Sequence, residues 1–279
     1  NMFSFSFGIK PLWHFRKLKG VKQLIAPRGM LGEGALQLKA KKKKLFLSLA
    51  KRLLYRENLH WHASTKDEAN EIKQTIGERA KVQIAQNLSS KPQLRDEKTT
   101  RKQKGELNLV FISRMSEKKN LLFLLELLSG FKHGESITLD IYGPAEDKNY
   151  WARCKKIICE DNEISYKGEL QPNEINKTLQ RYHFYILPTL HENYGHTIAE
   201  AWLSGLPVII SNNTPWSNLE KQGIGCELPL DYKVIWEEKL KEFSALGQVE
   251  YQGMVHNCFS FSKANLFNQE VLAANRNLF

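Results

Sequence analysis

The chain of 279 residues has few of the features that mark secreted, zinc-binding or membrane-spanning proteins. It has four cysteines, with no C-x-x-C pair and no histidine at zinc-ligand spacing, so we expect reduced, mostly buried thiols in a cytoplasmic protein. No apolar run approaches the roughly 18 residues that cross a bilayer. The opening residues 1–7 are apolar but lack a basic leader and a small-residue cleavage site, which argues against a signal peptide.

Acidic residues are outnumbered, and the excess positive charge favours an anionic partner. With 41 basic and 30 acidic residues, the formal net charge is +11. The segment Lys39–Arg56 holds eight basic residues and no acidic one, interleaved with apolar residues at helical spacing (Leu45, Phe46, Leu49 and Leu53). We favour a surface helix with a solvated basic face and a buried apolar stripe; a helix lying on an anionic membrane is the alternative. Nucleic acid is not expected, because no recognised nucleic-acid module accompanies the charge.

Two regions of alternating strand and helix signals are separated by a polar stretch. The first region contains candidate strands at 21–26 and 59–63. Thr65 and Glu68 form a predicted capping box, with Glu68 reaching back to the N-cap, and this box begins a helix that ends near Ile76. Residues 87–106 are rich in Lys, Arg, Ser, Thr and Gln, so this stretch is the best linker candidate.

The second region has the clearer pattern, since short apolar runs alternate with helical segments. This pattern implies a parallel sheet covered by helices on both faces. The predicted strands are 107–113, 137–142, 164–167, 183–187 and 207–210, and the predicted helices are 120–128, 150–159, 172–182, 196–204 and 262–278. We therefore divide the chain into a partial N-terminal domain (1–95), a C-terminal domain (96–261) and a terminal helix (262–279).

Two loops that follow predicted strands carry charged residues suited to a ligand. In parallel α/β sheets, ligands bind at the carboxyl ends of the strands. Arg114 and Lys119 follow the first strand, where a guanidinium and an ammonium group could neutralise a diphosphate, although basic loops are common. After the strand 183–187, Glu192 and Glu200 flank a turn at Gly195, and their carboxylates suit sugar hydroxyls. Stabilisation of the helix dipole explains Glu200 equally well, but not the whole run.

The run Glu192-Asn193-Tyr194-Gly195-His196-Thr197-Ile198-Ala199-Glu200 resembles the E-x7-E element of the retaining glycosyltransferases called family 4 or group 1. Arg114 and Lys119 are similar to that family's R-x4-K diphosphate clamp. Further similarities lie at 27–31, 62–65, 142–144, 168–170 and 204–209. The resemblance implies an α/β fold of the GT-B type, with a Rossmann-like donor domain and an incomplete Rossmann-like acceptor domain.

The resemblance also implies roles for individual residues. Arg114 and Lys119 would hold the diphosphate of the donor and stabilise it as a leaving group, Glu192 would contact the transferred sugar, and Glu200 would bind the ribose hydroxyls. The other implied donor-binding residues are Asn193, Tyr194, Gly195, His196 and Thr197 for sugar and phosphate, and Gly143 and Leu170 for the base. No metal or cofactor is expected, because the chain has no Asp-x-Asp and the two cations would supply the charge.

Some features depart from the family pattern. The start of the acceptor domain, with its glycine-rich first loop and usual active-site histidine, finds no match, and we expect His60 and His62 to be structural. Asn120 stands where the family often has glycine. An uncovered sheet edge would leave apolar side chains exposed at Phe3, Phe5, Phe7 and Trp13.

The leading hypothesis is a retaining hexosyltransferase that uses a UDP- or GDP-sugar and a glycan or lipid-linked acceptor in polysaccharide biosynthesis. It would work in the cytoplasm, and the basic segment Lys39–Arg56 would bring it to the inner membrane face. Two alternatives stay open. One is a non-catalytic nucleotide-sugar-binding or scaffold protein that assembles with a partner, and the other is a nucleotide-sugar 2-epimerase.

Overall fold

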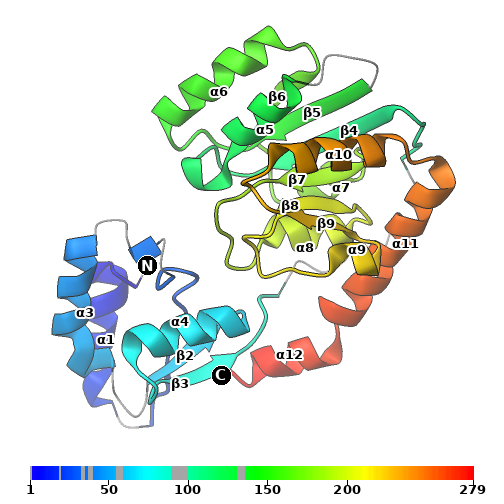
Figure 1. The fold of residues 1–279 in the computed structure, drawn as a ribbon. Coiled ribbons are helices and arrows are strands. Elements are labelled where there is room, and N and C mark those ends of the chain that lie inside the picture. Colours follow the sequence, from blue (N-terminus) through cyan, green and yellow to red (C-terminus); the bar gives the residue numbers. More distant parts are fainter. Residues whose placement is uncertain are drawn as a thin grey trace. The chain divides into compact units, whose positions relative to one another are not determined.

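The chain forms two units in a computed structural model that describes residues 2–18, 20–32, 35–36, 40–54, 59–88, 100–130 and 136–279 (Figure 1). Residues 1–88 together with 268–279 make the smaller unit, and residues 89–267 make the larger one. The described residues include no helix that is long and apolar enough to cross a membrane.

Six parallel strands form the sheet of the larger unit, in the order β6-β5-β4-β7-β8-β9. All five strands predicted for this region are present. Their bounds are β4 (Glu106–Ile112), β5 (Ser136–Tyr142), β6 (Ile164–Gly168), β7 (Phe184–Leu187) and β8 (Val208–Ser211), and the sixth is β9 (Gly225–Leu228). Strands β7 and β8 are buried along their whole length, as expected for a parallel sheet with both faces covered.

The helices of the larger unit form two packed groups. Helix α5 (Leu121–Leu128) packs against α6 (Lys148–Glu160) and α10 (Lys233–Ser244), whereas α8 (His196–Leu203) packs against α7 (Ile175–Leu179) and α11 (Gln248–Asn265). The short η3 (Glu117–Lys119) and α9 (Leu219–Gln222) complete the unit. Right-handed connections that run outward in opposite directions from β4 and β7 place α5 and α8 on opposite faces of the sheet. The predicted helix 172–182 is shorter than expected, because turns occupy both of its ends.

The predicted terminal helix 262–278 is interrupted. Helix α11 ends at Asn265, and α12 (Gln269–Arg276) begins four residues later. The break follows from Asn268, whose side chain accepts a hydrogen bond from the Val271 amide at 2.8 Å and so caps a new helix. Asn275 of α12 donates to the carbonyl of Gln86, which ties this end of the chain to the smaller unit.

A three-stranded parallel sheet in the order β1-β2-β3 organises the smaller unit. Its strands are β1 (Gln23–Ile25), β2 (Leu59–Ala63) and β3 (Lys81–Ile84), and the last of these was not predicted. Its further helices are η1 (Phe5–Ile9), α1 (Lys10–His14), η2 (Phe15–Lys17), α3 (Ala40–Leu54) and α4 (Lys66–Ile76). Strand β2 alternates buried and half-buried residues, with Trp61 buried in the core of the unit.

The capping box predicted at the start of α4 is only half present. The Thr65 hydroxyl accepts from the Glu68 amide at 3.1 Å, as expected. The Glu68 carboxylate is buried and accepts instead from the amides of Gly29 and Ser64, each at 2.7 Å, and from the Ser64 hydroxyl at 2.8 Å. These donors come from the turn after β1 and from the end of β2, so Glu68 joins three segments rather than only capping one.

Helix α3 confirms the predicted basic helix but not the whole of its buried stripe. Leu45 is 62% exposed, whereas Phe46 and Leu47 pack against the core of the unit. The side chains of Leu49 and Leu53 and the residues 55–58 lie outside the described part of the chain. The ring of Phe46 meets that of Phe3 edge-on at 5.1 Å, which turns this face of the helix inward and leaves Leu45 outside.

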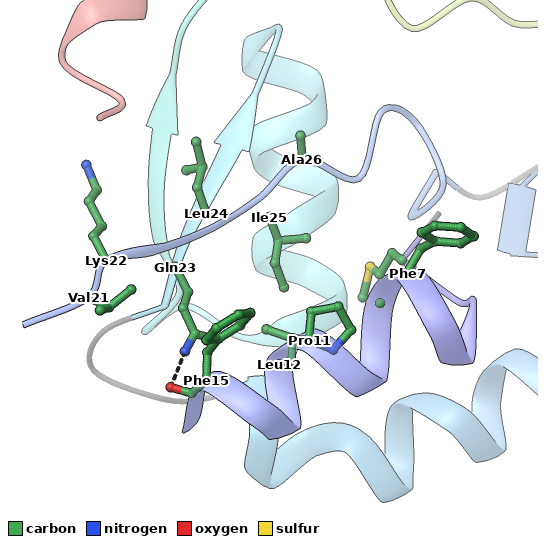
Figure 2. A pocket seen from close by; sticks show the side chains of 12 residues that line it. Phe7, Pro11, Leu12, Phe15, Val21, Lys22, Gln23, Leu24, Ile25 and Ala26 are labelled. Carbon is green, nitrogen blue, oxygen red and sulfur yellow. Dashed lines mark hydrogen bonds between the residues drawn. The ribbon is translucent and has the colours of Figure 1, made fainter. Parts of the chain in front are cut away.

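A cavity of about 380 Å³ lies in the smaller unit between the η1–η2 segment and the strand β1. Figure 2 shows Phe7, Pro11 and Leu12 on the helical side and Leu24 and Ile25 on the strand. The Gln23 side chain donates to the carbonyl of Phe15 at 2.9 Å and closes one end. Phe7 is 81% exposed, in agreement with the expectation for this aromatic segment, although Phe3 is only half-exposed.

The polar stretch 87–106 is not a free linker at its C-terminal end. Residues 89–99 lie outside the described part of the chain, but Lys102 is buried. Its ammonium group donates to the carbonyls of Gln103, Ser244 and Leu246 at 2.8–3.1 Å. The three backbone carbonyls satisfy the charge, and the two at the end of α10, those of Ser244 and Leu246, hold this segment to the larger unit.

The turn between β5 and α6 depends on a glycine. Gly143 has φ +132°, and a Cβ there would lie 2.0 Å from the carbonyl oxygen of Ser113 in the neighbouring loop. A glycine without such constraint is Gly253 in α11, where a Cβ would meet nothing within 4 Å.

We expect Gly143→Ala to destabilise the larger unit by about 3–5 kcal/mol, because a strained φ and a backbone clash act together. The matched change Gly253→Ala should stabilise it by about 0.5–1 kcal/mol, since alanine favours a helix interior. Urea unfolding of both variants measures the difference. Equal unfolding midpoints would contradict the close approach at Gly143.

Candidate functional site

The order of the strands reverses between β4 and β7, which are neighbours at the centre of the larger sheet. From β4 the chain moves outward to β5 and β6, and from β7 it moves the other way to β8 and β9. The loops after β4 and β7 therefore leave the sheet in opposite directions and open a crevice between them. In open α/β sheets this is where ligands bind. The two loops singled out from the sequence are the two that border it.

The loop after β4 carries Arg114 and Lys119. The Arg114 guanidinium is half-exposed and donates to the carboxylate of Glu146 at 3.1–3.2 Å. Lys119 ends η3, and Asn120 follows with φ +57° at the N-cap of α5. Asparagine tolerates this left-handed conformation better than most residues, which explains why it stands where glycine is common in the resembling family.

The loop after β7 runs from Pro188 to Gly195, and α8 begins at His196. Gly195 is the N-cap of α8 with φ +80°. A Cβ on Gly195 would lie 2.6 Å from the Ile198 side chain and 3.2 Å from the Cγ of Glu192. Any larger residue would therefore displace Glu192 as well as strain the backbone.

Backbone hydrogen bonds tie the two loops together. The carbonyl of Lys118 accepts from the amide of Leu190 at 2.8 Å and from the hydroxyl of Thr189 at 3.0 Å. Next to this junction, the ammonium group of Lys119 pairs with the carboxylate of Glu192, and the two side chains are only 11% and 14% exposed. Lys119 and Glu192, which are 73 residues apart, thus meet at the crevice.

Glu200 lies on α8 with a largely buried side chain. Burial raises the pKa of its carboxyl group, and no hydrogen bond or ion pair reaches that carboxylate from the residues that the structure describes. An acceptor held in this way suits a ligand that brings its own hydroxyl donors.

Tyr185 is a site residue that the sequence reasoning missed. Its hydroxyl is fully buried and donates to the carbonyl of Ile112 at 3.3 Å, which joins β7 to the end of β4. Burial, followed by the charges of Glu192 and Glu200, raises the pKa of Tyr185 well above its ordinary value. A tyrosine within an apolar strand is typical of a buried core residue. Only the position of β7 in the sheet shows that Tyr185 lies near Glu192 and Glu200.

His191 was missed as well. Its Nε2 atom is buried with no hydrogen-bond partner among the described residues. Burial is the main cause that lowers the pKa of this imidazole, and the charge of Lys118 adds to the effect. His191 is therefore neutral at physiological pH and occupies the loop position directly before Glu192.

The remaining predicted residues lie at different depths around the crevice. Gly143 touches Ser113 beside Arg114, and its carbonyl accepts from the Tyr166 hydroxyl at 3.0 Å. Leu170 follows β6, two strands away from β4, and packs against the core. The others belong to the loop and first turn of α8: the Asn193 amide donates to Glu192 at 3.3 Å, the ring of Tyr194 is buried 5.1 Å from that of His196, and Thr197 lies beside Tyr185.

The two histidines of β2 belong to the smaller unit. The Nε2 atom of His62 lies 2.7 Å from the carbonyl oxygen of Ala85 and so links β2 to the residue after β3. Burial, Lys22 and Lys81 together lower the pKa of His60.

Comparisons with known proteins agree with this geometry. Residues 92–225 match the family described as "Glycosyl transferases group 1". The UDP-N-acetylglucosamine–peptide N-acetylglucosaminyltransferase GtfA subunit of Limosilactobacillus reuteri subsp. suis is 28% identical over 139 residues. That alignment covers 48% of this chain and 26% of the relative.

Two solved structures share the fold. A mutant of S. aureus TarM in complex with Fondaparinux, alpha-GlcNAc-glycerol and UDP has a TM-score of 0.66 and 15% identity, over 85% of this chain and 46% of that one. The pneumococcal O-GlcNAc transferase GtfA in complex with UDP and GlcNAc has a TM-score of 0.61 and 18% identity, over 84% and 47%. This likeness confirms the predicted α/β fold of the GT-B type. The chain spans about half the length of these two proteins.

Replacing Glu200 with glutamine should stabilise the fold at neutral pH. Because burial raises the pKa of Glu200, its ionised form is less favourable in the fold than in the unfolded chain, and this penalty applies above the raised pKa. We expect Glu200→Gln to melt at a higher temperature than the wild type at about pH 7.5, with the difference vanishing at about pH 4.

Calorimetric melting across this pH range measures the effect. The control is Glu238→Gln, which neutralises an exposed carboxylate of α10 and should leave the melting temperature nearly unchanged. If Glu200→Gln melted at or below the wild-type temperature at neutral pH, the prediction would be wrong, because the ionised Glu200 carboxylate would then be stabilised by hydrogen bonds or charges within the fold.

Proposed function

We propose that this protein, whose residues 92–225 match the group 1 glycosyltransferase family, transfers a hexose from a nucleotide sugar, linked to UDP or GDP, to a glycan or lipid-linked acceptor with retention of configuration. The observation that carries the proposal is the pairing of Lys119 with Glu192 where the strand order reverses, next to a helix that holds the largely buried Glu200. The curated relative is named for UDP-N-acetylglucosamine, and both solved structures contain UDP, so a UDP-sugar is the first donor to test.

In the proposed reaction, the bond between the anomeric carbon of the sugar and the diphosphate oxygen breaks. A bond from the acceptor hydroxyl oxygen to that carbon forms, and the hydroxyl proton passes to the departing diphosphate. Negative charge develops on the diphosphate, and Arg114 and Lys119 would compensate it, so the proposal requires neither a metal nor a cofactor.

In the proposed reaction, the ion pair between Lys119 and Glu192 exchanges its partners when the donor binds. When the ammonium group turns to the diphosphate, the carboxylate of Glu192 becomes available to accept hydrogen bonds from the hydroxyls of the transferred sugar. Glu200 would accept from the ribose hydroxyls. The backbone from Asn193 to Thr197 would hold sugar and phosphate, and Gly143 and Leu170 would border the base.

Nucleotide binding tests this assignment. We expect titration calorimetry with UDP, GDP and ADP to show one preferred nucleotide, and both Lys119→Ala and Glu200→Ala to weaken it about 10–100-fold, because each removes a charge-assisted hydrogen bond of about 1.5–3 kcal/mol.

Lys118→Ala is the matched control for the lysine variant. It removes the same charge one residue away, from an exposed side chain, and keeps the carbonyl that ties the two loops. It should change the affinity less than threefold, which is the range of a screened surface charge. If Lys119→Ala bound as tightly as Lys118→Ala, the clamp would be wrong, and if the folded wild type bound none of the three nucleotides, the donor site would be wrong.

We also propose that the smaller unit works at an anionic membrane surface, where polysaccharide precursors with lipid-linked acceptors would be found. The first 56 residues contain 14 of the 41 basic residues but only one acidic residue, Glu33. In the same segment, several large aromatic side chains are exposed on η1, α1 and η2: Phe5, Phe7, Trp13 and Phe15. Basic and aromatic side chains together suit the headgroup region of a membrane.

Vesicle binding tests the membrane proposal. We expect binding to phosphatidylglycerol vesicles but not to phosphatidylcholine vesicles, with affinity falling as salt rises. Changing both Lys41 and Lys42 of α3 to glutamine should weaken binding about 10–30-fold, since a lysine near an anionic surface contributes about 1 kcal/mol. Changing Lys155 and Lys156, an exposed lysine pair on α6 of the larger unit, removes the same charge and should have no comparable effect. Equal weakening by the two double variants, or binding that salt does not reduce, would contradict the proposal.

A further inference from the structure

We propose that Trp216 is a positioning residue that sets the orientation of the Tyr194–Gly195 peptide and thereby directs the Gly195 amide toward the diphosphate of the donor. This inference rests on the proposed function and adds a residue to it. Trp216 lies in the loop after β8, 24 residues beyond Glu192, in a segment that has no part in the E-x7-E element.

The segment 211–216 supports the whole loop after β7. The Ser211 hydroxyl donates to the carbonyl of Thr189 at 2.5 Å, and the carbonyl of Asn213 accepts from the Glu192 amide at 2.9 Å. The Trp216 indole donates to the carbonyl of Tyr194 at 2.5 Å. These three bonds fall at the start, middle and end of the loop, so the β8 side fixes its path as firmly as Lys118 does on the β4 side.

The bond to Tyr194 has a consequence for the next residue. In a planar trans peptide, the C=O and N–H bonds point in opposite directions. Since the Tyr194 carbonyl points to Trp216 on the β8 side, the Gly195 amide points to the other side. Trp216 packs against Trp202 of α8 and Phe261 of α11, so the Gly195 amide points away from these rings, and we place the diphosphate on that side.

The conformation of Gly195 alone does not determine the orientation of the Tyr194–Gly195 peptide. Glycine adopts positive and negative φ with similar ease, so the peptide before it is free to turn over. The observed φ of +80° corresponds to one of the two orientations, and the hydrogen bond from Trp216 favours it. The Gly195 amide has no hydrogen-bond partner within the described ranges, and it is the N-cap of α8, where an anion gains from the helix dipole.

The indole is itself held in place by other rings. Its centroid lies 5.4 Å from that of Tyr194 and 5.0 Å from that of Trp202, with interplanar angles of 59° and 82°. Trp202 lies on α8 and donates to the carbonyl of Ile224 at 3.1 Å. Trp216 therefore has little freedom to release the Tyr194 carbonyl.

The ratio of affinities for a nucleoside monophosphate and the matching diphosphate tests this proposal. Both ligands contain the base and ribose, but only the diphosphate carries the distal phosphate that the Gly195 amide would contact. We expect Trp216→Phe, which keeps an aromatic ring but lacks the N–H donor, to weaken diphosphate binding about tenfold. Monophosphate binding should stay within twofold of the wild type.

Trp236→Phe is the matched control. The Trp236 indole is also buried and donates to a backbone carbonyl, that of Pro229 at 2.9 Å, but it lies on α10 and outside the loop. It should leave the affinity ratio unchanged. Glu200→Ala should weaken both ligands alike, because both carry the ribose.

Each outcome separates this inference from the proposed function. If the wild type binds neither nucleotide, the proposed function fails. If it binds both and Trp216→Phe leaves the ratio unchanged or weakens both ligands equally, only the role of Trp216 fails. Should Trp216→Phe not fold, the isosteric analogue benzothienylalanine at position 216, with sulfur in place of the N–H group, provides the same test, and an unchanged ratio would again overturn the proposal.

Discussion

The carbonyl group of Lys118 is the contact on which the candidate site depends. It accepts from both the amide of Leu190 and the hydroxyl of Thr189, and so joins two loops that leave the sheet in opposite directions. A reversal of strand order only opens a crevice; it does not set how far apart the side chains on its two walls stand. Because the carbonyl belongs to the residue before Lys119, and its partners lie just before Glu192, the joint brings these two charged groups within contact distance.

The site contains several groups whose charged form is disfavoured by burial. Glu200 carries a carboxyl group with a raised pKa, Tyr185 has a phenol that stays protonated, and His191 has a neutral imidazole with an unsatisfied nitrogen. Buried polar groups without partners destabilise a fold, and they are concentrated at sites where a ligand completes them. The core of the larger unit consists mainly of apolar side chains, and these three polar groups lie together on β7, in the loop that follows it and on α8.

Sequence reasoning predicted the elements that periodicity specifies. The five strands of the larger sheet and the basic helix α3 follow from runs of apolar or basic residues, and the loops of Arg114 and Glu192 follow from strand ends. Strands β3 and β9 have four residues each and too little pattern to be recognised. The apolar stripe assigned to α3 was wrong at Leu45, because the pairing of Phe3 with Phe46 decides which face turns inward. The roles of Tyr185 and Trp216 depend on which strands are neighbours, and sequence spacing does not contain that information.

The split composition of the smaller unit bears on the order in which the two units are completed. The smaller unit contains residues from both sides of the larger one, and α12 contributes a hydrogen bond from Asn275 to Gln86. During synthesis, residues 1–88 emerge before the larger unit, but about 180 further residues must follow before α12 can join them. The larger unit, whose segments are contiguous, is complete before that moment. Residues 1–88 are therefore translated before the larger unit but completed after it, and until then their exposed aromatic and basic segment is available to other binding partners.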